Sequence, residues 1–161
     1  VGNLVPTFPR AIYYVQRQEL ADATYPNERT RCVYLRENLE PLQASGQLRL
    51  LSGDTQLTEQ VRVMLTPGHT PGHQSVVVES EGHSVVFLGD VASWPLHMES
   101  LARVTAFDVQ PLVNMQTKQR IAQWAVANKA LLIFDHHTQI GAGYLQPTDN
   151  ADSFRVEPVE I

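Results

Sequence analysis

The stretch that decides the fold is TPGHTPGH, residues 66–73. Its two prolines, two glycines and two histidines fit neither a helical nor a strand pattern, so the stretch is predicted to be a loop. Proline fixes φ, and glycine permits positive φ and close approach of the backbone, so such a loop holds its shape tightly. Because a rigid loop loses little entropy when a metal site forms, its imidazoles are well placed to bind a metal ion.

Polar side chains follow apolar runs at three separate places in the sequence. His69 follows the run 61–65, Asp90 follows the run 84–88, and His136 follows the run 130–134. If these runs are strands that end along one rim of a sheet, the three side chains converge there. Imidazole and carboxylate donors suit zinc, iron or manganese. A carboxylate that bridges two such cations would activate a shared water for hydrolysis of an ester, lactone, amide or phosphoester.

Apolar runs and helical periodicity together predict a mixed α/β class. Strands are expected at residues 10–15, 48–51, 61–65, 75–79, 84–88, 130–134 and 154–156, and helices at 18–21, 36–44 and 116–129. The runs 75–79 and 84–88 read as an antiparallel hairpin, and their nearly continuous apolar character predicts burial on both faces. Residues 91–115 are expected to form a long irregular connection, and the tail from Gly141 a loop before the last strand.

Composition sets the broad class. The 161 residues, 43% hydrophobic and 18% charged, fit one packed domain over residues 1–161. Twelve basic against seventeen acidic residues give a net charge of −5, which lacks the basic footprint of nucleic-acid binders. No apolar run approaches the ~20 residues that span a bilayer. Cys32 is the only cysteine, which excludes an internal disulfide and a Cys-rich zinc site. We expect a cytoplasmic protein that acts on a small molecule and binds neither nucleic acid nor membrane.

These motifs resemble the later motifs of the metallo-β-lactamase fold hydrolases, in the branch of glyoxalase II, lactonases and organophosphate hydrolases. The order matches, with 21 residues from His69 to Asp90 and 46 from Asp90 to His136, and the resemblance runs from about Ala11 past Phe134. It implies an αββα sandwich in which His69 and His136 bind metal and Asp90 bridges two ions as the catalytic carboxylate. It also implies that His73 supports the site from behind, that the metal is zinc, manganese or iron, and that the substrate is a small ester, lactone or phosphotriester.

One element of the family pattern is absent. The leading motif His-x-His-x-Asp-His does not occur, and the first histidine of the chain is His69. We therefore expect the chain to be the C-terminal portion of such a hydrolase, a partial sandwich whose binuclear centre forms only in the parent protein. An exposed sheet edge in such a portion would favour homodimerisation.

Several residues have two interpretations. His73 fits a structural role as well as a supporting one, and the family pattern favours His136 over its neighbour His137 as the ligand. Trp94, His97, Phe107 and His137 are candidates for a substrate pocket. Core packing explains Trp94 and Phe107 equally well, and surface exposure is the simpler expectation for His97.

Two other functions remain open from the sequence. The chain could be a non-catalytic interaction module. It could also be a mononuclear iron enzyme with two histidines and one carboxylate, although such triads usually place the first histidine and the acid within a few residues of each other.

Overall fold

The computed structural model describes residues 4–150 and 153–160. The mixed α/β class predicted from the sequence is confirmed. Within the predicted single domain the chain forms two compact units, one up to Gly53 and the other from Asp54 onward, and each is described by itself. Among the described residues, no helix is both long and apolar enough to cross a bilayer.

The described part of the first unit, from residue 4 on, contains two strands and two helices. They are β1 (Tyr13–Gln16), α1 (Arg17–Thr24), α2 (Arg36–Ala44) and β2 (Leu48–Leu51). β1 and β2 pair in parallel, with Tyr13 opposite Leu48. The prediction for α2 is confirmed, and Gly46, which follows it, adopts the left-handed φ of 70° that ends helices. The strand predicted at 10–15 begins later, at Tyr13, and the helix after it is longer than predicted.

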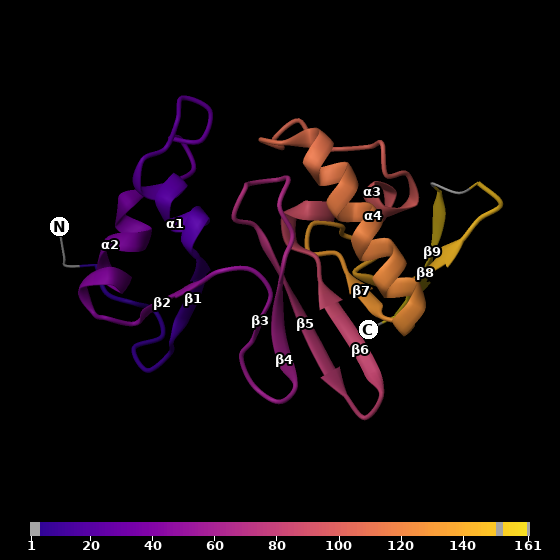
Figure 1. Ribbon diagram of the computed structural model, residues 1–161, viewed down its shortest axis with the longest axis horizontal. Coiled ribbons are helices and arrows are strands. Elements are labelled where there is room, and N and C mark those ends of the chain that lie inside the picture. Colours follow the sequence, from indigo (N-terminus) through magenta and orange to yellow (C-terminus); the bar gives the residue numbers. More distant parts are fainter. Residues whose placement is uncertain (1–3, 151–152, 161) are drawn as a thin grey trace. The chain divides into compact units, whose positions relative to one another are not determined.

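The second unit is built on one sheet with strand order β3-β4-β5-β6-β7-β8-β9 within the described residues (Figure 1). The strands are β3 (Thr55–Gln56), β4 (Val61–Leu65), β5 (Gln74–Ser80), β6 (His83–Phe87), β7 (Leu131–Ile133), β8 (Ala142–Pro147) and β9 (Phe154–Val159). β6 and β7 are parallel, and the other neighbours are antiparallel. Among the described residues of this unit, the helices are the short 3-10 helix η1 (Gly89–Ala92), the short helix α3 (Pro95–Glu99) and the long helix α4 (Pro111–Asn128).

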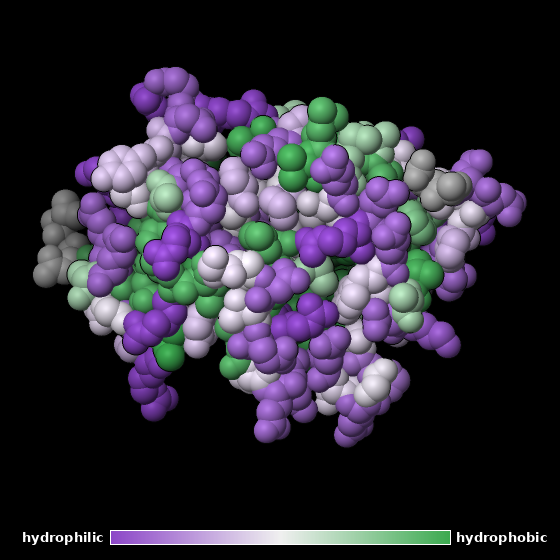
Figure 2. Space-filling view, in the orientation of Figure 1, coloured by the Kyte–Doolittle hydropathy of each residue, from purple (hydrophilic) through white to green (hydrophobic). Residues whose placement is uncertain are grey.

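The core of this unit lies between α4 and one face of the sheet. Ile121, Ala122 and Ala125 of α4 pack with buried strand residues such as Val77, Val86 and Leu132. The predicted hairpin of β5 and β6 is confirmed, with Val77 opposite Val86. Its predicted burial on both faces is wrong, because Phe87 on the other face is 48% exposed. At the strand ends where β5 turns into β6, hydrophilic side chains gather (Figure 2).

Two segments predicted to be irregular contain regular structure. The connection 91–115 holds the end of η1, all of α3 and the first turn of α4. Pro95 and Pro111 stand at the first position of α3 and α4, where the missing N–H of proline costs nothing. β8 lies in the predicted loop after Gly141 because it pairs along its whole length with β9. Its small residues and proline carry little strand signal of their own.

Close packing of β8 against β9 should make Gly143 sensitive to substitution. A Cβ at this position would lie 2.5 Å from Val156 Cγ1 and 2.7 Å from the carbonyl oxygen of Glu157. We expect Gly143→Ala to lower the free energy of unfolding by about 1–3 kcal/mol. Gln146→Ala, at an exposed position of the same strand, should change it by less than about 0.5 kcal/mol. Equal denaturant midpoints for the two variants would contradict this packing.

Candidate metal centre

The sheet brings the three sequence-predicted ligands to one edge. β6 and β7 run parallel, and β4 also runs parallel to β6 because each is antiparallel to β5. The carboxyl ends of β4, β6 and β7 therefore meet at the same edge. His69 follows β4 in the loop, Asp90 follows β6 in η1, and His136 follows β7.

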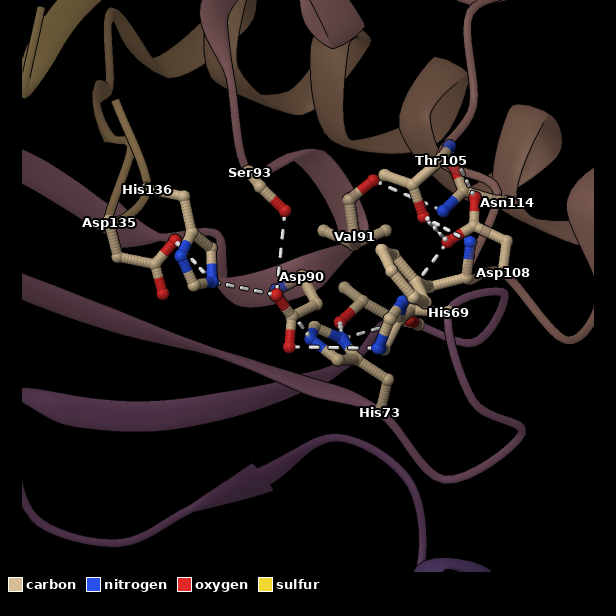
Figure 3. A network of polar contacts seen from close by, with 12 residues as sticks. His69, His73, Asp90, Val91, Ser93, Thr105, Asp108, Asn114, Asp135 and His136 are labelled. Carbon is tan, nitrogen blue, oxygen red and sulfur yellow. Dashed lines mark hydrogen bonds and ion pairs between the residues drawn. The ribbon is translucent and has the colours of Figure 1, made fainter. Parts of the chain in front are cut away.

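Asp90 lies between the two imidazoles, and each of its oxygens faces a different one (Figure 3). His136 Nε2 is 3.0 Å from Asp90 Oδ1, and His69 Nε2 is 3.6 Å from Asp90 Oδ2. Two ligands of a tetrahedral zinc ion, each 2.0–2.2 Å from the metal, are about 3.4 Å apart. Each imidazole–oxygen pair thus has the spacing of two ligands that share a metal ion. Ser93 Oγ also donates to Asp90 Oδ1, at 3.4 Å.

His69 is oriented by a buried carboxylate that the sequence analysis missed. Asp108 Oδ1 lies 3.1 Å from His69 Nδ1 and also accepts a hydrogen bond from Thr105 Oγ1 at 2.9 Å. A carboxylate accepts hydrogen bonds, so Nδ1 of His69 donates to Asp108, and Nε2 is the ring nitrogen that faces Asp90. Nε2 and Asp90 Oδ2 are 3.6 Å apart. Such an arrangement favours a proton or a metal cation between them.

His73 lies behind Asp90 and fixes its backbone. The N–H of Asp90 donates to His73 Nε2 at 3.1 Å, so His73 carries its proton on Nδ1. Nδ1 contacts Thr66 Oγ1 at 2.8 Å, which contacts Ser75 Oγ at 3.0 Å, and Ser75 donates to the carbonyl of Leu88 at 2.9 Å. Each group in this series therefore donates to the next, from His73 Nδ1 through Thr66 and Ser75 to the carbonyl of Leu88, just after β6. This geometry supports the positioning role expected for His73 and leaves its Nε2 engaged with the backbone.

The start of α4 holds the His69 loop in place. Val109 N–H donates to the carbonyl of His69, and Gln110 N–H donates to that of Gly68, both at 2.9 Å. Gly68 has φ of 143°, and a Cβ there would overlap the backbone of Asn114. The loop and the helix approach so closely at Gly68 that only glycine fits there.

The described donors form two separate pairs rather than one group of three. His69 and Asp90 Oδ2 form one pair, and His136 and Asp90 Oδ1 form the other. In the described parts of the chain, no group of three or more His, Cys, Asp or Glu side chains is arranged to hold one ion. The donor types and spacings therefore fit part of a two-metal centre. They do not match a mononuclear site in which both histidines and the carboxylate share one iron.

A cleft of about 590 Å³ opens beside these side chains. Besides His69, Asp90 and His136, it is lined by Ser93, Trp94, His97, Thr105, Ala106 and Phe107. Trp94 is 49% exposed and Phe107 80% exposed, so the alternative that they pack in the core is wrong. His97 is partly buried rather than on the open surface as expected.

His137 is the one pocket candidate that does not line the cleft. It contacts Trp94 edge to face, with ring centroids 5.7 Å apart, and its Nδ1 accepts the N–H of Ile140 at 2.8 Å. His137 therefore contacts Trp94, a residue that lines the cleft, without lining the cleft itself.

A buried lysine holds the segment that forms one wall of the cleft. Lys118 of α4 is fully buried, and its ammonium donates to the carbonyl of His97, at 3.1 Å, and to that of Arg103. Burial lowers the pKa of Lys118 to about 8, and the charge of Asp108 opposes this. Burial also lowers the pKa of His97, and the nearby charge of Lys118 lowers it further, against Asp108.

Comparisons with known proteins match both the sequence and the fold. The family model described as the metallo-beta-lactamase superfamily matches residues 5–104. An N-acyl homoserine lactonase of Bacillus cereus is 28% identical over 123 residues, which are 76% of this chain and 45% of that protein. The chain thus spans about half the length of the curated relatives it matches.

Two solved structures share the fold. A probable metal-dependent hydrolase from Staphylococcus aureus superposes with a TM-score of 0.80 at 23% identity, covering 98% of this chain and 56% of that one. AidC, a dizinc quorum-quenching lactonase in complex with the product N-hexanoyl-L-homoserine, superposes with a TM-score of 0.75 at 17% identity. It covers 98% of this chain and 60% of that one.

Asp108 should be needed for tight metal binding. Asp108→Asn replaces the acceptor for His69 Nδ1–H by an amide that can present a donor, so the imidazole loses its fixed tautomer. We expect zinc affinity of the whole protein to fall about 10- to 100-fold. The exposed Asp149→Asn is the matched control and should leave the affinity unchanged. Equal zinc affinities for the two variants, measured by competition with a chelator, would refute this role for Asp108.

The buried ammonium of Lys118 should leave a signature in the pH dependence of stability. The pKa is about 8 in the folded chain and 10.5 in the reference state, so the unfolded chain binds more protons between these pH values. Stability should therefore rise with pH across that window, by about 2–3 kcal/mol at most relative to Lys118→Met. Lys129→Met, at an exposed position, should retain the rise. Parallel stability curves for wild type and Lys118→Met would contradict the lowered pKa.

Proposed function

Because this chain belongs to the metallo-beta-lactamase superfamily, we propose that it forms part of the active site of a metal-dependent hydrolase that opens small lactones. The observation that carries the proposal is the Asp90 carboxylate, with each oxygen facing a different imidazole. Lactones are the favoured substrates because relatives are named N-acyl homoserine lactonases. Small esters and phosphotriesters would suit the same chemistry.

In the proposed centre, the side chains divide their roles by position. His69 with Asp90 Oδ2 would hold one ion, and His136 with Asp90 Oδ1 would hold the other. The further ligands needed to complete each coordination sphere would come from outside the described residues. Zinc suits these donors, as do manganese and iron. Metal ions in such a pair lower the pKa of a bound water toward about 7 and polarise the substrate oxygen.

The other residues of the site would keep the donors in place. Asp108 holds His69 with its Nε2 lone pair toward Asp90, and His73 holds the Asp90 backbone through its N–H. Asp90 is the catalytic carboxylate in this proposal because it would supply one oxygen to each of the two metal ions. Trp94 and Phe107 would exclude water from the apolar part of the substrate along the cleft.

Removal of a single imidazole tests the proposal. In the whole protein, His69→Ala should lower bound zinc and reduce kcat/KM for N-hexanoyl homoserine lactone about 100-fold or more, since even indirect supports of metal ligands are worth 10- to 100-fold. His83→Ala, an exposed histidine of the β5–β6 hairpin, is the control and should change neither. If His69→Ala retained full metal content and lactone hydrolysis, the assignment would be wrong.

A further inference from the structure

Away from the candidate metal positions, the cleft offers no cationic side chain. Its lining contains no lysine or arginine among the described residues. Lys118, a basic side chain behind this wall, is fully buried and donates to backbone carbonyls. A charged anionic group on the part of a ligand remote from the metals would therefore find no cationic side chain in this lining to offset its desolvation. On the outer side, Trp94 and Phe107 present exposed aromatic surface for an apolar group.

His97 is the polar side chain of this wall whose hydrogen bonding is incomplete. It lines the cleft from α3, and its Nδ1 is buried with no hydrogen-bond partner among the described residues. A neutral imidazole carries its proton on one of its two nitrogens. We assign it to Nε2, which leaves no N–H donor on the buried Nδ1. Nε2–H is then the one hydrogen-bond donor of the His97 side chain.

The surroundings of His97 favour its neutral form and fix its backbone. Burial and the neighbouring charge of Lys118 lower the pKa of His97, while Asp108 acts in the opposite direction. Its backbone is tied at both ends: the N–H donates to the carbonyl of Trp94 at 2.9 Å, and the carbonyl accepts from Lys118 at 3.1 Å. A neutral, fixed donor beside an aromatic wall recognises a neutral acceptor.

We propose that His97 is a specificity-determining residue that donates a hydrogen bond from Nε2 to an uncharged carbonyl oxygen of the substrate, outside the bond that is cleaved. The apolar part of the same substrate lies along Trp94 and Phe107. This inference rests on the proposed function, and it narrows the substrate to molecules that combine an apolar tail with an uncharged acyl or amide carbonyl away from the bond that is cleaved. In this proposal His97 acts through binding and discrimination.

The kinetic test compares two lactones in the whole protein. N-Hexanoyl homoserine lactone carries an amide carbonyl, whereas γ-decalactone carries an apolar tail on a lactone ring without an amide. His97→Phe should lower kcat/KM for the amide-bearing lactone about tenfold, the worth of one hydrogen bond, and for γ-decalactone by less than about twofold. His97→Gln keeps a side-chain N–H donor and should restore most of the lost selectivity. A parallel loss on both lactones, or no loss on either, would overturn the proposal.

A binding measurement separates this inference from the proposed function. In imidazole ¹⁵N spectra, His97 should be a neutral Nε2–H tautomer at pH 7, and N-hexanoyl-L-homoserine amide should shift its Nε2 signal in the wild type. If the protein hydrolyses neither lactone but His97 shows this shift, the inference stands and the proposed function fails. If the probe leaves the His97 signals unchanged, or if His97 is the Nδ1–H tautomer, the inference fails whatever the activity. Far-UV circular dichroism of both variants checks that they are folded.

Discussion

The site depends on one constraint, which is that the Asp90 carboxylate is held between two imidazoles from distant parts of the chain. Its backbone N–H is fixed by His73, and each of its oxygens faces one ring. The carboxylate cannot be placed this way by local sequence alone. It requires β4, β6 and β7 to end at one edge, and hence the antiparallel path through β5 and the parallel pairing of β6 with β7. The fold and the site are therefore two consequences of the same strand order.

The electrostatics of this arrangement favour a cation. Asp108 fixes the proton of His69 on Nδ1, which turns the Nε2 lone pair toward a carboxylate that also offers lone pairs. A positive charge between the two atoms would be stabilised by both, so the carboxylate of Asp108 and the geometry of Asp90 act together. In the proposed centre the described side chains would supply two donors to each metal ion, so further ligands would be needed to complete the coordination sphere.

The sequence predicted those parts of the site that have a local signature. His69, Asp90 and His136 could be recognised because each follows an apolar strand, and the Gly-Pro loop around His69 signals rigidity. Asp108 could not be recognised because it lies 39 residues from His69, and only the contact between the loop and the start of α4 brings them together. The pocket residues were predicted from the sequence only in part. The sequence placed Trp94 and Phe107 in one connection, but their exposure depends on how α3 turns that connection back onto the sheet.

The strands show the same division between local and distant information. β5 and β6 carry continuous β-branched runs, whereas β8 is strand only because β9 pairs with it along its length. Lys118 is a further case, because a lysine in a helix predicts a solvated position and tertiary contacts bury it here. In the folded chain its ammonium donates to the carbonyls of the segment that carries His97 instead of to water. The wall of the cleft therefore depends on a residue that belongs to no sequence motif.

The most direct measurement of the central claim is anomalous X-ray scattering at the zinc absorption edge, from crystals of the whole protein grown with zinc. The account predicts two peaks, one on each side of the Asp90 carboxylate. One should lie about 2.1 Å from His69 Nε2 and the other about 2.1 Å from His136 Nε2. A single peak bonded to both imidazoles, or zinc bound out of reach of Asp90, would contradict the assignment of Asp90 as the bridge.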